Sequence, residues 1–171
     1  MTINEIYYDR DRKIPAVFEV DDKGYAILKP YVINLCYSCR QDVTEKDYYI
    51  YGNSKVKTTA YLNLTVYDKS EVIDNYGSGI STQGESNESN IISRNGGSVR
   101  LIGNATAKIY DAYVVNAHGN SKVEIFGKNP HNLVMAYKKS HVIAHDDVEV
   151  IACENSTVTM DNKDNLRDHR Q

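Results

Sequence analysis

A repeat of eight residues constrains this chain of 171 residues more than any other feature. An apolar residue returns at the first position of each repeat, and the two departures from the period, from Ile80 to Ile91 and from Val123 to Val134, both span eleven residues. Each departure equals one repeat plus three residues, which predicts a three-residue insertion at a turn. The apolar series consists of Tyr48, Val56, Leu64, Val72, Ile80, Ile91, Val99, Ala107, Val115, Val123, Val134, Val142, Val150, Val158 and Leu166.

Each repeat reads as a short strand followed by a tight corner. The first and third positions are mostly apolar or small and the second is more often polar, as in Val115-Asn116-Ala117, so alternate side chains point inward. The seventh position is often Ser or Ala, which fits a tight bend. The fifth position favours residues that tolerate the positive φ of a corner. The Gly, Asp and Asn residues at the fifth position are Gly52, Asp68, Gly84, Asn95, Gly103, Asp111, Gly119, Gly127, Asp146 and Asn162.

A strand and a corner every eight residues cannot bury an apolar face alone, whereas stacked coils can. The sequence therefore predicts an all-β fold, a single-stranded parallel β-solenoid (β-helix). An α-helical repeat fold is excluded, because eight residues leave no room for a helix-turn-helix unit. Three repeats per coil would give about five coils and roughly 25 Å, and two would give about seven coils and roughly 35 Å. Short strands with frequent corners favour three repeats and a triangular section.

The repeat divides the chain into three parts. Residues 1–47 lack it and are expected to form an N-terminal β cap, with a β-hairpin across residues 16–28 whose turn contains Gly24. Residues 48–166 form the solenoid, whose open first coil needs such a cap. Residues 167–171 form a polar tail that blunts the last edge or frays.

Composition supports β structure but names no partner. The chain has 16 Val and 15 Ile against 7 Leu, with 16 Asn and 14 Tyr, a composition that favours strands and turns. A net charge of −3, with lysines scattered among acidic residues, disfavours a nucleic-acid partner. No apolar run approaches the ~18–20 residues of a membrane span, and Met1–Glu5 lacks the features of a secretory signal. A cytoplasmic location is therefore expected.

The repeat also resembles one known kind of repeat. Segments such as Tyr51-Gly52-Asn53-Ser54-Lys55-Val56 are similar to the GNS-x-V β-solenoid repeats (V-x-A-x-G-N-S-x) of small proteins from bacteriophages, prophages and bacterial mobile elements. The resemblance covers about residues 48–166 and implies a scaffold without a catalytic motif. The sequence excludes three other kinds of solenoid: calcium-binding β-rolls, hexapeptide-repeat acyltransferases and ice-binding solenoids. The Gly-Gly-x-Gly-x-Asp motif, a six-residue period and regular Thr-x-Thr ladders are all absent from the sequence.

The fourth position of the repeat is rich in rings and is expected to face outward. Aligned aromatic side chains on a rigid face form a binding surface, because Tyr supplies a large contact area at a low entropic cost. The alternative is that the rings stack between coils and stabilise the sheet. The sequence leaves both alternatives open. The residues are Tyr51, Tyr67, Tyr110, His118, Phe126, Tyr137 and His145, with Cys153 in the same series.

The thiols and imidazoles offer only weak metal ligands. Cys36 and Cys39 form a C-x-x-C, and His141 and His145 are four residues apart, so a Cys2His2 set is present in the inventory. The distance in sequence between the two pairs is far outside the spacing of a zinc finger. The three cysteines, an odd number, fit reduced thiols. We therefore expect no metal and no cofactor, with Cys36 and Cys39 as the weak candidates.

The sequence contains no recognisable nucleophilic triad, phosphate-binding loop or pair of catalytic carboxylates. The expected function is that of a non-catalytic interaction protein, and the resemblance of the repeats implies that a phage or mobile element encodes it. The protein would bind a host protein in the bacterial cytoplasm and inhibit a host defence system, as anti-CRISPR proteins do. The second hypothesis is a structural protein that self-assembles as a homo-oligomer on a virion or cell surface. The third is a carbohydrate-active β-helix enzyme.

Overall fold

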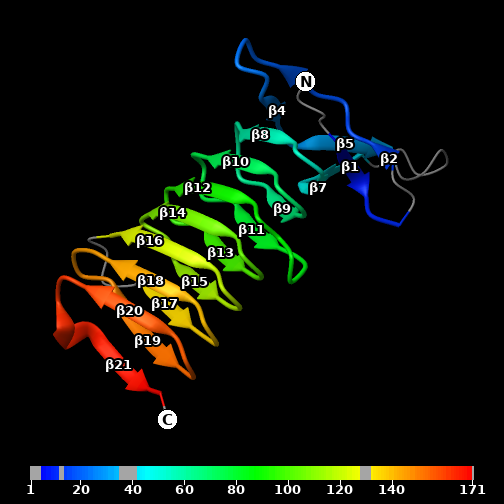
Figure 1. Ribbon diagram of the computed structural model, residues 1–171. Helices are drawn as coiled ribbons and strands as arrows, with labels where there is room; N and C mark the ends of the chain where they lie inside the picture. The colour runs from blue at the N-terminus through cyan, green and yellow to red at the C-terminus, as the bar shows by residue number, and fades with distance from the viewer. Residues whose placement is uncertain (1–4, 12–13, 35–41, 128–131, 171) are drawn as a thin grey trace.

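The structure, a computed structural model, describes residues 5–11, 14–34, 42–127 and 132–170. Two sheets face each other across one core (Figure 1). In spatial order, the ten-stranded sheet contains β2 (Ile14–Pro15), β1 (Glu5–Asp9), β7 (Asp47–Tyr51), β9 (Asn63–Val66), β11 (Gly79–Thr82), β13 (Ser98–Leu101), β15 (Val114–Ala117), β17 (Leu133–Ala136), β19 (Glu149–Cys153) and β21 (Leu166–His169).

The nine-stranded sheet follows the same path on the other side of the core. Its strands, in spatial order, are β20 (Thr157–Met160), β18 (His141–Ala144), β16 (Lys122–Phe126), β14 (Thr106–Tyr110), β12 (Asn90–Arg94), β10 (Glu71–Asp74), β8 (Lys55–Thr58), β4 (Ala26–Leu28) and β3 (Glu19–Val20). A short 3-10 helix, η1 (Lys163–Asn165), precedes β21, and a separate antiparallel pair consists of β5 (Tyr31–Asn34) and β6 (Asp42–Glu45).

From β7 onwards, consecutive strands alternate between the two sheets, and neighbours within a sheet pair in parallel. Each coil therefore contains two repeats, and the chain forms a β-solenoid of about seven turns. The prediction of three repeats per coil is wrong. Each corner reverses the direction of the chain, so the next strand runs back on the opposite side of the core. The cross-section of the solenoid is therefore flat. Seven turns give a length of roughly 35 Å.

Both interruptions of the period lie between strands, as the sequence predicts. Val72 pairs with Ile91 in the nine-stranded sheet and Val115 pairs with Val134 in the ten-stranded sheet, so the register continues across each insertion. The first insertion lies between β11 and β12, and the second lies between β16 and β17. A turn can absorb three residues because the inward alternation and the strand hydrogen bonds hold the register on either side.

The inward side chains of the two sheets meet in one continuous core. The first-position side chain is buried in every repeat from Tyr48 to Val150, and it is half-buried at Val158 and Leu166 in the last turn. The third position points inward as well, from Ile50 in the first coil onwards. The core is therefore two side chains wide on each strand, which explains why a repeat of only eight residues can bury an apolar face once coils are stacked.

A buried polar cluster takes third positions in early coils of the nine-stranded sheet. Asp74 is fully buried, and its carboxylate accepts hydrogen bonds from the hydroxyls of Thr58 (2.6 Å), Ser78 (2.7 Å) and Ser93 (3.2 Å). The backbone N–H groups of Tyr76 (3.2 Å) and Ser78 (2.9 Å) also donate to it. These donors compensate for the loss of water around the carboxylate. Asp74 thereby holds the turn that follows β10.

The corners use left-handed backbone where the repeat predicts it. Eight of the ten predicted fifth-position residues have a positive φ, and the exceptions are Gly127 and Asn162. Lys138 (φ 57°) and Glu154 (φ 53°) adopt the same conformation, although neither is Gly, Asn or Asp. The period predicts a corner at both positions, but the residue types gave no indication of a positive φ.

The N-terminal segment covers the first coil. β3 and β4 form the predicted hairpin, with Gly24 at φ 80° in its turn. β4 also pairs in parallel with β8, so it extends the nine-stranded sheet, and β1 pairs antiparallel with β7 in the ten-stranded sheet. At the other end, β21 pairs in parallel with β19 and includes residues 167–169 of the segment expected to be a polar tail.

Candidate functional site

The alternation of strands gives the solenoid two long edges made of turns (Figure 1). The cavity edge consists of the turns that follow strands of the ten-stranded sheet, β7, β9, β11, β13, β15, β17 and β19. The tyrosine edge consists of the turns that follow strands of the nine-stranded sheet, β8, β10, β12, β14, β16, β18 and β20. The fourth position of each repeat comes directly after the inward third position and lies at one of these corners.

The predicted aromatic series does not share one surface. Because a coil contains two repeats, consecutive repeats turn at opposite edges and the series splits into two columns. Tyr51, Tyr67, His118 and Tyr137 lie at the cavity edge, and Tyr110, Phe126 and His145 lie at the tyrosine edge. The expectation of a single binding face built from all seven residues is therefore corrected.

A stack of rings crosses three coils at the tyrosine edge. Phe126 stacks on Tyr110 at 5.2 Å between ring centres and on His145 at 4.4 Å, with interplanar angles of 13° and 12°. The Arg94 guanidinium lies 5.2 Å from the centre of the Tyr110 ring. At the other end, Nδ1 of His145 is 3.0 Å from the carboxylate of Asp161. These rings contact one another between coils and stabilise the edge.

Three further tyrosines at this edge are exposed, and the repeat pattern does not mark them. The exposed fractions are 50% for Tyr61, 52% for Tyr76 and 62% for Tyr113. They occupy the turns after β8, β10 and β14, outside the fourth position. A Cβ atom built on Gly96 would lie 3.8 Å from Cδ2 of Tyr113, so this ring rests near the preceding turn. The available sequence signal is a large ring inside a turn, where the repeat favours small or polar residues.

Two ring pairs occupy the cavity edge. Tyr51 and Tyr67 stack at 4.2 Å with an angle of 4°, and His118 and Tyr137 stack at 4.5 Å with an angle of 6°. Burial, followed by the positive charges of two basic neighbours, lowers the pKa of His118 below its ordinary value of 6.5. The His118 ring is therefore mainly neutral at pH 7.

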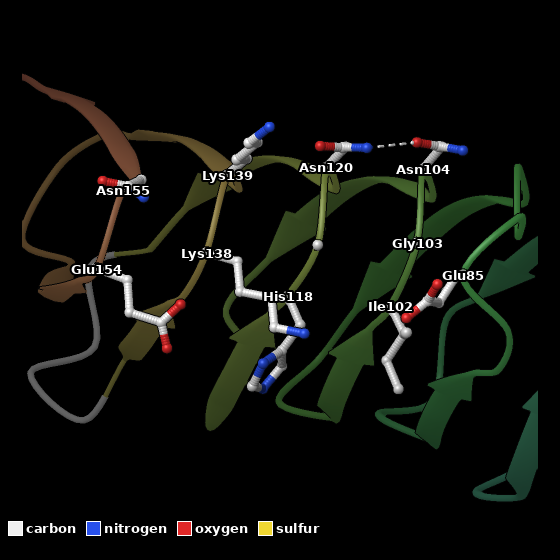
Figure 2. Close-up of a pocket in the computed structure, with 11 residues that line it drawn as sticks. Glu85, Ile102, Gly103, Asn104, His118, Asn120, Lys138, Lys139, Glu154 and Asn155 are labelled. Carbon is white, nitrogen blue, oxygen red and sulfur yellow. Dashed lines mark hydrogen bonds between the residues drawn. The ribbon is translucent and has the colours of Figure 1, made fainter.

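A cavity with a volume of about 460 Å³ opens on the cavity edge beside His118 (Figure 2). Its lining includes Gly103 and Gly119, which occupy the fifth-position column in neighbouring coils. Lys138 and Glu154 occupy the same column in the next two coils. The Lys138 side chain extends toward His118, and that of Glu154 extends toward Lys138 (Figure 2). The rest of the lining comes from Glu85, Ile102, Asn104, Asn120, Lys139 and Asn155.

The weak metal candidates gain no support from the part of the chain that the structure describes. Cys36 and Cys39 lie outside the described residues. Cys153 is a half-buried free thiol at the end of β19. Within the described ranges, no three side chains of His, Cys, Asp or Glu are grouped so that they could hold a metal ion. In the same ranges, no helix is long and apolar enough to cross a membrane.

Fold and surfaces together define a small two-sheet β-solenoid with two chemically different edges. A comparison with protein-family models finds no match, and neither a curated protein nor a solved structure matches the chain significantly. The two edges themselves are therefore the basis for assigning a function.

Proposed function

We propose that this protein is a non-catalytic interaction scaffold that binds a partner protein through the tyrosine edge. The observation that supports this proposal is the presence of three tyrosines, Tyr61, Tyr76 and Tyr113, that are at least half exposed on turns of one edge. Tyrosine gives a large contact area with few rotatable bonds and is enriched among the residues that dominate binding energy. The stacked coils hold these turns in place, which lowers the entropy lost on binding.

The dimensions of this edge suit a protein ligand. Tyr76 and Tyr113 follow β10 and β14, which are two coils apart in the nine-stranded sheet, so their turns are separated by roughly 10 Å. The ring stack from Arg94 to His145 continues the same edge over the neighbouring coils. An edge of seven coils is long enough for a partner to contact roughly 800 Å², the area that each side of a standard protein interface buries.

The test compares variants of the immobilised protein in a lysate of a bacterial host. The double variant Tyr76→Ala/Tyr113→Ala removes two exposed rings and leaves the core intact. We expect it to lose a protein that the wild type retains in a stoichiometric amount. Val17→Ala is the control, because this side chain is 83% exposed in the N-terminal segment, and it should retain the same protein.

Equal retention by the wild type and the double variant would contradict the tyrosine edge as the binding surface. A sedimentation experiment on the purified chain addresses the structural alternative. A single small species agrees with an interaction scaffold, whereas long homopolymers favour a self-assembling structural protein.

The proposal extends to a phage or mobile-element protein whose partner belongs to a host defence system. Its support is the resemblance of the GNS-x-V repeats, exemplified by Gly52-Asn53-Ser54-Lys55-Val56. A plaque assay tests this part: expression of the chain in a strain with an active CRISPR system should restore plaques of a targeted phage. Unchanged interference would contradict inhibition of that system, while the pull-down decides separately whether the tyrosine edge binds a protein.

A further inference from the structure

The corners at Lys138 and Glu154 keep a backbone conformation that is unfavourable for their side chains. Their φ values are 57° and 53°, whereas the preceding coils have Gly103 and Gly119 at the same position of the repeat. A left-handed conformation is unfavourable for a residue with a side chain, because Cβ comes too close to the carbonyl oxygen. Both residues line the cavity of about 460 Å³. Because strained residues concentrate at binding sites, the cavity edge is a candidate site independent of the tyrosine edge.

The charges around the cavity balance. The lining contains two glutamates, Glu85 and Glu154, and two lysines, Lys138 and Lys139, so their formal charges sum to zero. The lowered pKa of His118 keeps this ring mainly neutral at pH 7. An anion would face two carboxylates and a cation would face two ammonium groups. The charge balance therefore favours a neutral ligand.

The polar groups that remain are three side-chain amides in the sixth-position row, in which Lys139 separates Asn155 from Asn120. Asn104, Asn120 and Asn155 occupy the sixth position in different coils, and Nδ2 of Asn120 donates to Oδ1 of Asn104 at 3.1 Å. Successive coils are roughly 5 Å apart. Each amide both donates and accepts hydrogen bonds, which is also what a hydroxyl group does. Ile102 and His118 add apolar contact beside this row.

A peptide strand fits this cavity less well. The N–H of Asn120 donates to the carbonyl of Gly103 at 2.9 Å, and the N–H of Asn104 donates to the carbonyl of Asn87 at 2.8 Å. These backbone groups already join the coils, so they do not offer a free strand edge for an added peptide.

We infer that the cavity binds a neutral, hydroxyl-rich ligand, an oligosaccharide that lies along the axis of the solenoid. The amides of Asn104, Asn120 and Asn155 bind its hydroxyl groups, and Ile102 and His118 contact its C–H face. Lys138 and Glu154 form the wall at one end and provide further hydrogen-bonding groups. The ligand is bound and released without a covalent step.

Titration followed by ¹H–¹⁵N NMR tests this inference on the full chain. The probes are maltotetraose, cellotetraose and the tetramer of N-acetylglucosamine, with tetragalacturonate as the acidic comparison. At least one neutral tetramer should shift the amide signals of Gly103 and Gly119 and leave those of Asp111 and Asp146, at the opposite edge, unchanged. Absence of these shifts with all three neutral tetramers overturns the inference. Tighter binding of tetragalacturonate, or equal shifts with an extended hexa-alanine peptide, overturns the assignment to a neutral sugar.

Two variants place the ligand in the cavity. Asn120→Ala should raise the dissociation constant of the bound tetramer at least tenfold. Asn53→Ala, which changes the same residue type at the same repeat position in a coil outside the cavity, should leave the constant unchanged. Equal effects of the two variants would contradict the inferred contact.

Lys138→Gly separates binding from folding. It removes a wall of the cavity and relieves the positive φ, so it should raise the melting temperature while weakening sugar binding. A more stable variant with unchanged affinity would contradict a role for Lys138 in the site.

Discussion

At the scale of the residue, Gly84 and Gly103 occupy equivalent corners but have different surroundings. A Cβ atom on Gly84 (φ 97°) would meet nothing within 4 Å, whereas one on Gly103 (φ 79°) would lie 2.6 Å from the carbonyl oxygen of Gly84. Gly84→Ala should therefore lower the free energy of unfolding by about 1 kcal/mol, and Gly103→Ala by about 3 kcal/mol or more. Urea denaturation measures both. Equal losses would mean that the close approach of the two coils is not what requires Gly103.

The serines at the seventh position allow a second matched comparison. The hydroxyl of Ser54 donates to the carbonyl of Tyr51 (2.6 Å) and accepts from the N–H of Glu5 (2.7 Å). The buried hydroxyl of Ser121 has no hydrogen-bond partner among the described residues, and Ala105 occupies the same position one coil earlier.

Ser54→Ala should lower the free energy of unfolding by about 1–2 kcal/mol, because it leaves the N–H of Glu5 without its acceptor. Ser121→Ala should leave that free energy unchanged or raise it, because it removes a buried polar atom without a partner. Thermal unfolding of both variants measures the difference. A larger loss for Ser121→Ala would show that its hydroxyl is bonded in solution.

Single residues show where the sequence pattern was informative. Gly103 and Asp68 were predicted as corners because both tolerate positive φ, and both adopt it. The positive φ of Lys138 and Glu154 was not predicted. The pattern identifies residue types that favour this conformation, but other residue types can adopt it too. Tyr113 was missed because it stands at a seventh position, where the repeat usually has Ser or Ala, and the preference of a position gives no information about an exception to it.

At the scale of the element, Phe126 is the centre of the ring stack on the tyrosine edge. In a double-mutant cycle, Phe126→Ala and His145→Ala should show a coupling of about 0.5–1.5 kcal/mol, because the rings stack at 4.4 Å. Phe126→Ala and Tyr137→Ala lie on opposite edges and should be additive within about 0.5 kcal/mol. Urea denaturation of the wild type and the five variants, three single and two double, measures both cycles. Additivity in the first cycle would show that the stack contributes nothing beyond burial.

The strands themselves were largely predictable, whereas their closure was not. The inward alternation in Val115-Asn116-Ala117 follows from the period alone, and so does the position of each three-residue insertion between strands. The pairing of Val72 with Ile91 also requires two repeats per coil, which the period does not fix. The number of repeats per coil depends on the angle of each corner. That angle is set by local contacts such as the hydrogen bond from Ser54 to the carbonyl of Tyr51. Inward side chains alternate in the same way in a flat and in a triangular solenoid, so the alternation does not distinguish two repeats per coil from three.

At the scale of the whole molecule, raised tyrosine pKa values predict a loss of stability in alkali. Hydrogen bonding to Glu71 raises the pKa of Tyr25 to about 12, and burial raises that of Tyr51 to about 12, from an ordinary value of 10.0. Burial also raises the pKa of Tyr48. Between pH 10 and pH 12 the unfolded chain has lost these protons while the folded chain keeps them.

The free energy of unfolding should therefore be fully retained below pH 10 and fall as the pH rises toward 12. Urea denaturation at several alkaline pH values measures this decline. Tyr25→Phe provides the matched comparison, because it keeps the ring and removes the titrating group, and it should show a weaker dependence on pH. A wild-type free energy that stays constant across this interval would contradict the raised values.

The two-repeat coil also limits how such a gene can lengthen or shorten. Loss or duplication of sixteen residues removes or adds one full turn and leaves every downstream side chain on its own edge. Loss of eight residues would move each downstream strand to the opposite sheet, so that Phe126 would turn at the cavity edge and Tyr137 at the tyrosine edge. Selection on either surface would therefore tolerate the gain or loss of whole turns only. Related chains would then differ in length by pairs of repeats, although the period in the sequence is a single repeat of eight residues.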